Sequence, residues 1–495
     1  MIAVASALWT LVLATGFILG FEPQGAVSSS RAAAASACAL HVSPVVVLPT
    51  DCLGVRRYSI PGEFQLEANS TRAGTLHIYL KALKWPMEDG TYRLRMKGFV
   101  GFEATAKPPK PGYTFKNVPE VSSQLRLYLR SAGGWQQEVA VELSDALCEW
   151  QPNKELFQAC LADAKRKSRT SYSLGDLSID LGDTQALDIE LLVQGWPRYV
   201  SLSAQLQAAL GAPPADADGG GVRTLHRTLP YHASLPVPRL ARILEWSEQY
   251  HTSLGFAGTY MYALPKDVAE LEAHPGIRSL VARRQLTIIL WDEFATYKNW
   301  RDYDLQIVES HAVLSLWGRN ARALVVDLDE FFVPGTAGDT LPRMLAPGGC
   351  MALGADCLSF SKKIMFTHTE GAKGGQPADE PSLWASSDPQ ARHPLVHYRY
   401  QQVPRDRGGP KNLVNPSTSM PMDIHWTSTC TGTSAISDGM AGDKAVSACA
   451  SRTPCVHVPR ECAMLGHIMN MLSTRRTSKN ASLVQPTKWL WMLKE

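Results

Sequence analysis

The sequence predicts a two-part protein, in which a β-rich, sandwich-like module precedes an α/β domain with a Rossmann-like sheet. Residues 39–200 carry short stretches of alternating polarity bounded by turn residues, whereas residues 223–480 alternate between helical and strand patterns. Between the two patterns, the stretch "GAPPADADGGGV" at 211–222 is rich in Pro, Gly and Ala. We therefore place a linker or exposed loop at 201–222.

The N-terminal segment 1–38 is predicted to be a signal anchor, or a signal peptide, followed by a stem. No residue from Ile2 to Phe21 is charged, and about 20 apolar residues suffice to span a bilayer. The small-residue run "RAAAASACAL" is where a cleavage site or the start of the stem is expected. Either interpretation places the rest of the chain in the secretory pathway.

Charge and cysteine content narrow the classes of protein further. The net charge of +3 over 495 residues gives no reason to expect a nucleic-acid partner. The ten cysteines include no CxxC pair, which disfavours a structural zinc site. We expect Cys350 and Cys357 to close one small loop and the last four cysteines to link the C-terminal segment, unless some are buried thiols. Asn69 and Asn480 begin N-glycosylation sequons.

Individual elements follow from the local patterns. In the N-terminal half, "RAGTLHIYLKAL", "GTYRLRMKGFVGFEA", "WQQEVAVELS" and "LDIELLVQGW" are predicted strands. In the C-terminal half, "VPRLARILEWSEQYHTSLGF" is a predicted helix with Pro238 in its first turn and Gly255 at its end. "YDLQIVESHAVLSLWG" is predicted to be an amphipathic helix ending at Gly318. The stretches "GTYMYAL", "RQLTIILW" and Leu324–Val326 are predicted buried strands.

The stretch "ALVVDLDEFFVP" carries the strongest chemical signal. Asp327 and Asp329 follow an apolar strand, where the chain leaves the predicted sheet and where ligands of such sheets gather. Two carboxylates placed in this way offer hard oxygen ligands for Mg²⁺ or Mn²⁺. The simplest alternative is an acidic turn with no other role.

Two enzyme classes use a DxD triplet after such a strand. Phosphatases of the haloacid dehalogenase type normally have Thr or Val two residues after the second Asp, and here Phe331 stands at that place. Nucleotide-sugar glycosyltransferases use the triplet to bind a metal ion that bridges a diphosphate. The predicted secretory location favours the glycosyltransferase interpretation.

Four blocks of the chain, within residues 220–475, resemble glycosyltransferase family 92, which has the GT-A fold and includes galactosyltransferases. "LEWSEQYHTSLGF" is similar to an early helix of the family. The DxDEF sequence followed by Pro334 is similar to its central block, and "GGPKNLVNPSTSMPMDIHW" to a later block. "CVHVPRECAMLGHIMNM" stands where the family has its C-terminal His-Tyr-Arg segment.

The resemblance implies a metal-dependent, inverting transfer of galactose from UDP-galactose to a glycan acceptor, with Mn²⁺ or Mg²⁺ as cofactor. It assigns Asp327, Asp329 and His467 to the metal, with Asp329 the more direct carboxylate ligand; His425 is a second candidate histidine. The alternative for either histidine is a hydrogen-bonded role near the core.

The resemblance also implies how the donor is held. Asp327, Asp329, Glu330 and Lys411 are expected to bind the UDP-sugar. Glu330 either supports the turn or approaches the sugar. Lys411 and Arg405 are expected to balance the diphosphate charge, and the alternative for both is a solvated surface cation.

An inverting transfer also needs a carboxylate to take the proton of the acceptor hydroxyl. Asp423 is our first choice because it neighbours His425. The alternatives are Asp292, Glu293 and Glu370.

These assignments imply a single-pass type II Golgi membrane protein with a luminal catalytic domain at 223–480 and a C-terminal tail at 481–495, or a secreted enzyme if the N-terminal segment is cleaved. The chain departs from the family at two places. No Tyr-Arg pair follows His467, and Ala263 follows Tyr262 where the family commonly has Asp. The alternative function is therefore a non-catalytic glycan-binding protein with a degenerate transferase domain.

Overall fold

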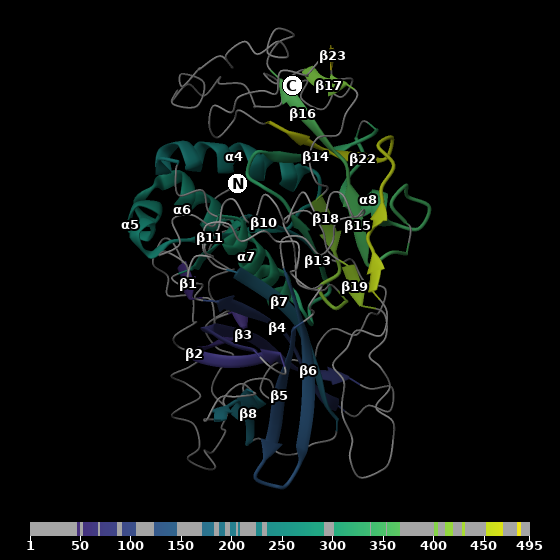
Figure 1. Ribbon diagram of the computed structural model, residues 1–495. Helices are drawn as coiled ribbons and strands as arrows, with labels where there is room; N and C mark the ends of the chain where they lie inside the picture. The colour runs from purple at the N-terminus through teal and green to yellow at the C-terminus, as the bar shows by residue number, and fades with distance from the viewer. Residues whose placement is uncertain are drawn as a thin grey trace, which may run out of the picture. The chain divides into compact units, whose positions relative to one another are not determined.

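Figure 1 shows the chain as a computed structural model. The residues it describes are 47–49, 53–67, 70–86, 92–104, 123–145, 171–182, 188–193, 199–203, 206–207, 224–229, 235–291, 301–336, 338–352, 354–366, 400–403, 411–418, 428–430, 452–468 and 483–486. The predicted segment 1–38 lies outside these residues, as do Asn69 and Asn480. No helix among the described residues is both long and apolar enough to cross a bilayer.

An eight-stranded mixed sheet forms the centre of the α/β part of the chain. Its strands are β1 (Val47–Pro49), β10 (Thr224–Leu229), β11 (Gly258–Ala263), β12 (Leu286–Leu290), β13 (Ala321–Val325), β15 (Cys357–Phe360), β18 (Lys411–Val414) and β21 (Val456–His457). They are ordered β1-β12-β11-β10-β13-β18-β15-β21, and the strands from β1 to β13 in this order are parallel.

The strand order creates a topological switch point. From β10 the chain adds β11 and then β12 on one side, and it then returns to place β13 on the other side of β10. In open α/β sheets, ligands bind beyond the carboxyl ends of the strands at such a point. The order therefore singles out the residues that follow β10 and β13. Whether the domain has the GT-A fold stays a prediction.

Helices cover both faces of this sheet. The described helices of this part are α4 (Val237–Ser253), α5 (Pro265–Ala273), α6 (Pro275–Ala282), α7 (Arg301–Leu316) and α8 (Leu341–Leu345). One hydrophobic cluster joins α4 and α6 to one face of β10–β13, and a second cluster joins α7 to the opposite face. The predicted helices and strands of this half are thus present.

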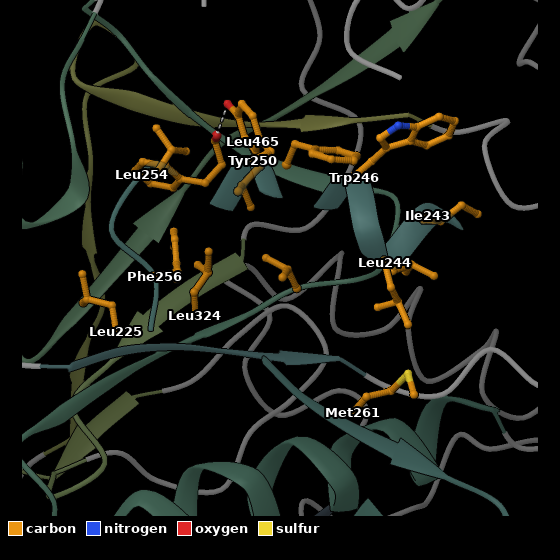
Figure 2. Close-up of a cluster of buried hydrophobic side chains, with 14 of the residues drawn as sticks. Leu225, Ile243, Leu244, Trp246, Tyr250, Leu254, Phe256, Met261, Leu324 and Leu465 are labelled. Atoms are coloured by element: carbon orange, nitrogen blue, oxygen red, sulfur yellow. Dashed lines mark hydrogen bonds between the residues drawn. The ribbon is translucent and has the colours of Figure 1, made fainter. Parts of the chain in front are cut away.

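Helix α4 follows its sequence pattern closely. Five apolar residues recur at helical spacing along α4, and all are buried in the first cluster, which Figure 2 shows over β10, β11 and β13. They are Leu240, Ile243, Leu244, Tyr250 and Leu254. Gly255 ends the helix at a φ of +96°, and a Cβ there would lie 2.6 Å from Pro342 Cδ of α8. Glycine is needed at this position for both reasons.

Helix α7 differs from the prediction of an amphipathic helix. Every residue from Gln306 to Trp317 is buried, including the polar Gln306, Glu309 and His311. The reason is that α7 has the α/β sheet on one side and strands of the N-terminal module on another, so its residues from Gln306 onward present no solvent face. The predicted polar face therefore carries buried polar groups.

The N-terminal module is an antiparallel sheet of eight strands. These are β2 (Arg56–Glu67), β3 (Ser70–Pro86), β4 (Tyr92–Ala104), β5 (Ser123–Ser131), β6 (Gln136–Asp145), β7 (Ser171–Gly182), β8 (Ile189–Val193) and β9 (Tyr199–Ser201), ordered β2-β3-β4-β7-β6-β5-β8-β9. Strands β2 and β5 also contact each other, so the sheet curls around a third hydrophobic cluster.

The module and the α/β sheet share core residues. Tyr79 of β3 stacks on Phe99 of β4 with ring centroids 4.5 Å apart, and both belong to the cluster that contains α7. Lys81 of β3 is buried and donates to the carbonyl oxygens of Ser315 and Trp317, at 2.6 and 2.8 Å, at the end of α7. The residues from Val42 onward form one compact unit.

A five-stranded sheet, ordered β14-β22-β16-β17-β23, carries the C-terminal part. Its strands are β14 (Glu330–Pro334), β16 (Lys362–Phe366), β17 (Tyr400–Val403), β22 (Ala463–His467) and β23 (Leu483–Pro486), and a further pair is β19 (Ser428–Cys430) with β20 (Arg452–Pro454). Strands β14 and β22 are antiparallel, with Glu330 opposite His467.

The predicted loop between Cys350 and Cys357 is wrong. Cys350 is bonded to Cys462, and Cys357 is bonded to Cys455. Each bond links a residue near β15 to the segment that leads into β22, because β15 pairs with β21 just before it. Of the last four cysteines, Cys455 and Cys462 therefore pair with the earlier two.

Candidate active site at the end of strand β13

The acidic motif forms a tight turn at the switch point. The N–H of Glu330 donates to the carbonyl oxygen of Asp327 at 3.1 Å, which closes a four-residue turn. The Glu330 side chain accepts from the N–H of Asp327 at 2.9 Å. Leu328, between the two aspartates, is buried in the core and anchors the turn. Of the three residues Asp-Leu-Asp, Leu328 packs in the core, Asp327 is partly exposed, and Asp329 is buried.

The turn brings Asp329 beside His467, although the two residues are far apart in the sequence. His467 Nε2 lies 3.4 Å from Asp329 Oδ2. The pairing of β14 with β22 produces this proximity, and the N–H of Ile468 donates to the carbonyl oxygen of Asp329 at 2.8 Å. The Asp329 side chain is almost fully buried and that of His467 is 11% exposed. A carboxylate and an imidazole thus meet at the edge of the site.

Asp327 belongs to a second group of charges centred on Lys411. Lys411 Nζ lies 3.4 Å from Asp327 Oδ2 and 3.9 Å from a carboxylate oxygen of both Glu309 and Glu330. Burial alone would lower the pKa of Lys411, but the carboxylates of Asp327, Glu330 and Glu309 outweigh it and raise the pKa. Lys411 is buried, so the alternative of a solvated surface cation does not describe it.

Glu330 is a structural acid within this group. It is fully buried, and one of its oxygens accepts from Lys362 Nζ of β16 at 2.9 Å. Burial would raise its pKa, but the ammonium groups of Lys362 and Lys411 outweigh burial, so the pKa lies below the usual value. Because its two oxygens bond Lys362 and the N–H of Asp327, the geometry favours the turn-supporting role over contact with a sugar.

Sequence reasoning missed Glu309 and Lys362. Glu309 reaches the site from α7, and Lys362 begins β16. A signal existed for Glu309, because an acidic residue within the apolar run "IVESHAVLSLW" needs a partner if that helix is buried. The pattern suggested a solvent-exposed face instead, which hid this signal.

Helix α4 supports the turn from behind. Tyr250 donates to the carbonyl oxygen of Phe332 at 2.7 Å, and His251 Nε2 accepts from the N–H of Phe332 at 3.2 Å. These two side chains therefore satisfy both backbone groups of one residue of β14, on the side facing away from β22. The early helix that carries the family resemblance is thus in contact with the strand that follows the DxD triplet.

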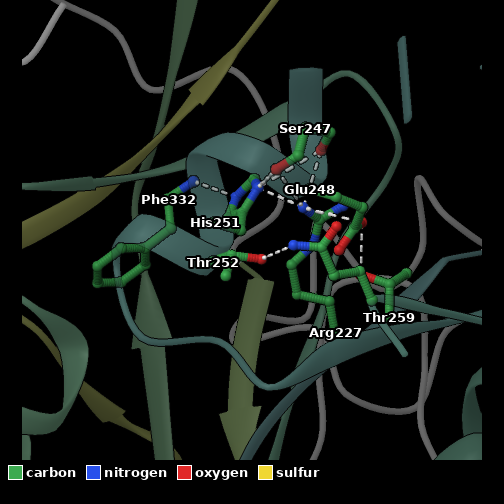
Figure 3. A network of polar contacts seen from close by, with 8 residues as sticks. Arg227, Ser247, Glu248, His251, Thr252, Thr259 and Phe332 are labelled. Carbon is green, nitrogen blue, oxygen red and sulfur yellow. Dashed lines mark hydrogen bonds and ion pairs between the residues drawn. The ribbon is translucent and has the colours of Figure 1, made fainter. Parts of the chain in front are cut away.

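A buried polar network joins α4 to the sheet next to this contact, as Figure 3 shows. Arg227 of β10 donates to Ser247 Oγ at 2.8 Å and lies 3.7 Å from Glu248 Oε1. Thr259 of β11 donates to the same Glu248 oxygen at 2.7 Å. Burial lowers the pKa of Arg227 and raises the pKa of Glu248, while each opposes the other's shift. The network fixes the helix that holds β14.

No protein-family model matches this chain, and no curated protein matches it. The relation to glycosyltransferase family 92 therefore stays a resemblance carried by the motifs alone.

The chemistry of the donors fits a divalent cation, although the predicted three-ligand set is incomplete. Among the described residues, no group of three His, Cys, Asp or Glu side chains is arranged around one point. Asp329 and His467 lie together, whereas Asp327 faces Lys411. Carboxylate oxygen and imidazole nitrogen both suit Mn²⁺. Among the described residues, the site holds four carboxylates, those of Glu309, Asp327, Asp329 and Glu330, and two ammonium groups, and a divalent cation would be attracted to such acidic surroundings.

Several predicted residues lie outside the part of the chain that the structure describes. These are Asp423, the first choice for the base, and Asp292, Glu293, Glu370, His425 and Arg405. Their assignments stay predictions.

A cavity of about 400 Å³ lies at the other end of β14 from the turn. Its lining includes Thr336, Asp339, Arg343 and the Cys350–Cys462 disulfide, and none of the predicted site residues.

Proposed function

We propose that the chain is an inverting, metal-dependent glycosyltransferase that moves a sugar, galactose from UDP-galactose, onto a glycan acceptor. The observation that carries the proposal is the meeting of Asp329 and His467, 3.4 Å apart, at the carboxyl end of β13. The sequence motif and the switch point of the sheet lead to this place independently.

Asp329 and His467 would hold Mn²⁺ or Mg²⁺ in this proposal. When bound, the metal neutralises the charge that develops on the leaving diphosphate. The four carboxylates that the described residues place at the turn support the need for such an ion, because they would repel a diphosphate. Glu330 keeps the turn closed, and the Lys362 ammonium group keeps Glu330 ionised.

The transfer itself needs a base. The acceptor hydroxyl attacks the anomeric carbon from the side opposite UDP, and a carboxylate takes the hydroxyl proton as the new bond forms. The bond from the anomeric carbon to the diphosphate oxygen breaks at the same time, and UDP leaves with its electron pair. We keep Asp423 as the first choice for this role.

The location of the reaction is part of the proposal. We place the protein in the Golgi membrane as a type II protein with its catalytic domain in the lumen, or outside the cell if the N-terminal segment is cleaved. The two disulfides support this, because disulfides persist in oxidising compartments.

A screen of UDP-sugar hydrolysis by the purified protein in the presence of Mn²⁺ tests the proposal. We expect UDP release from UDP-galactose by the unmodified chain and none by Asp329→Ala. Asp339→Ala, at the distant cavity, is the matched control and should keep the activity. The departures after His467 and Tyr262 favour the alternative, a glycan-binding protein; glycan binding without hydrolysis of any UDP-sugar would support it.

A further inference from the structure

We infer that Lys411 is a positioning residue: its ammonium group holds the Asp327 carboxylate from the protein side and does not contact the donor's diphosphate. The role given to Asp327 rests on the proposed function. The inference replaces the expectation that Lys411 balances the diphosphate charge directly.

The first support is the burial of Lys411 among protein carboxylates. Its side chain is 1% exposed, and it begins β18, a strand paired on both sides by β13 and β15. Oxygens of Asp327, Glu309 and Glu330, from three different elements, lie between 3.4 and 3.9 Å from its Nζ. A phosphate oxygen in contact with this ammonium group would have to displace one of them.

The second support is the sign of the local charge. Among the described residues, three carboxylates lie around the Lys411 ammonium group, and the one other ammonium group, that of Lys362, lies beside Glu330. An approaching diphosphate would be repelled by Glu309 and Glu330 before it reached the lysine. Lys411 thus serves as a counter-ion to the protein's own acids.

The third support is the difference in exposure among these acids. The Asp327 side chain is 20% exposed, whereas those of Glu309 and Glu330 are at most 1% exposed. Asp327 is therefore the member of the group that reaches solvent. Lys411 fixes its carboxylate from the buried side, as outer partners of metal and ligand sites commonly do.

Thermal unfolding in metal-free buffer tests the counter-ion role without reference to any activity. We expect Lys411→Met to lower the melting temperature strongly, because it leaves three carboxylates without their common counter-ion. In a Glu309→Gln background the same substitution should lower the melting temperature clearly less, since one of the buried negative charges has been removed. Equal losses in the two backgrounds would overturn the inference. Arg343→Met, with a side chain 75% exposed, is the control for loss of a cation.

Calorimetric titration of UDP in the presence of Mn²⁺ tests the positioning role. The folded double variant Lys411→Met/Glu309→Gln should bind UDP about 10- to 100-fold more weakly than Glu309→Gln. Adding Asp327→Asn to the double variant should cause little further loss, because both changes act through the same carboxylate. If the losses of UDP affinity caused by Lys411→Met and Asp327→Asn multiply, Lys411 contacts UDP by itself. That result would refute the inference.

The two experiments separate this inference from the proposed function. If the unmodified chain binds no UDP with Mn²⁺, the proposed function fails, and the unfolding comparison alone decides whether Lys411 is the counter-ion of the buried acids.

Discussion

At the scale of single residues, the two aspartates of the DxD triplet have different surroundings. Asp329 lies beside His467, whose ring nitrogen suits a shared metal ion. Asp327 lies beside Lys411, a fixed positive charge. Leu328 and Glu330 are buried and hold the turn in place. As a result, the two aspartates face different partners. The triplet is therefore one turn with two electrostatic environments.

The role of Glu330 as a buried structural acid gives the first prediction. Glu330→Gln leaves Lys362 and Lys411 with less compensation in the interior, so we expect the free energy of unfolding to fall by about 3–5 kcal/mol. Urea unfolding in the presence of EDTA measures this effect apart from metal binding.

Glu245→Gln, on the partly exposed surface of α4, is the matched control and should change stability by less than about 0.5 kcal/mol. Equal stability of Glu330→Gln and the unmodified chain would show that the ion pairs of Glu330 do not hold the turn.

At the scale of elements, β22 brings His467 to the site, and two disulfides hold its approach. Cys462 immediately precedes β22 and Cys455 precedes β21, and their partners lie 112 and 98 residues earlier in the chain. Crosslinks that close such long loops restrict the unfolded chain strongly. The position of His467 relative to Asp329 thus depends on a long-range covalent frame.

We predict that the double variant Cys357→Ser/Cys455→Ser is less stable by about 2–5 kcal/mol. Thermal unfolding without reductant measures the loss. Dithiothreitol should lower the melting temperature of the unmodified chain by more than that of the double variant, which has one bond fewer to lose. An equal response of the two proteins to dithiothreitol would contradict the prediction.

The elements also show what sequence patterns can and cannot reveal. Period and end signals located α4, β11, β12 and β13, because the apolar residues of α4 face one core, the strands are apolar on both faces, and Gly255 ends the helix. They misjudged α7, whose polar residues are buried by a module far away in sequence. They also missed the cysteine pairing and the partners of Lys411, which depend on contacts between distant segments. Local sequence does not encode those contacts.

At the scale of the whole molecule, the N-terminal module and the α/β sheet are joined through α7. Lys81 of β3 is one polar link, with its ammonium group or amine donating to two carbonyl oxygens at the end of the helix. Burial, with a smaller effect of Arg319, lowers the pKa of Lys81 to about 7 from its ordinary 10.5. A neutral amine has two N–H groups, which match the two carbonyl acceptors.

This pKa shift predicts a pH dependence of stability. Below about pH 7 both the folded and the unfolded state carry a protonated Lys81, and the cost of burying its charge is fully present. Between about pH 7 and 10.5 the unfolded state binds more protons at this site, so its contribution makes stability rise with pH.

Lys81→Met should abolish that rise, whereas Lys84→Met on the same strand should keep it. Urea unfolding across this pH range measures both variants. A Lys81→Met protein with the same pH profile as the unmodified chain would show that the charge of Lys81 is not suppressed at the junction.

The central claim is that the turn after β13, with His467 of β22, binds a divalent metal together with UDP. Electron paramagnetic resonance of Mn²⁺ measures it most directly, because bound Mn²⁺ loses the signal of the free ion. We predict that UDP strengthens Mn²⁺ binding to the unmodified chain and that Asp329→Asn and His467→Ala each abolish binding, while both variants keep the fold. Unchanged Mn²⁺ binding in Asp329→Asn, or none in the unmodified chain with UDP, would contradict the claim.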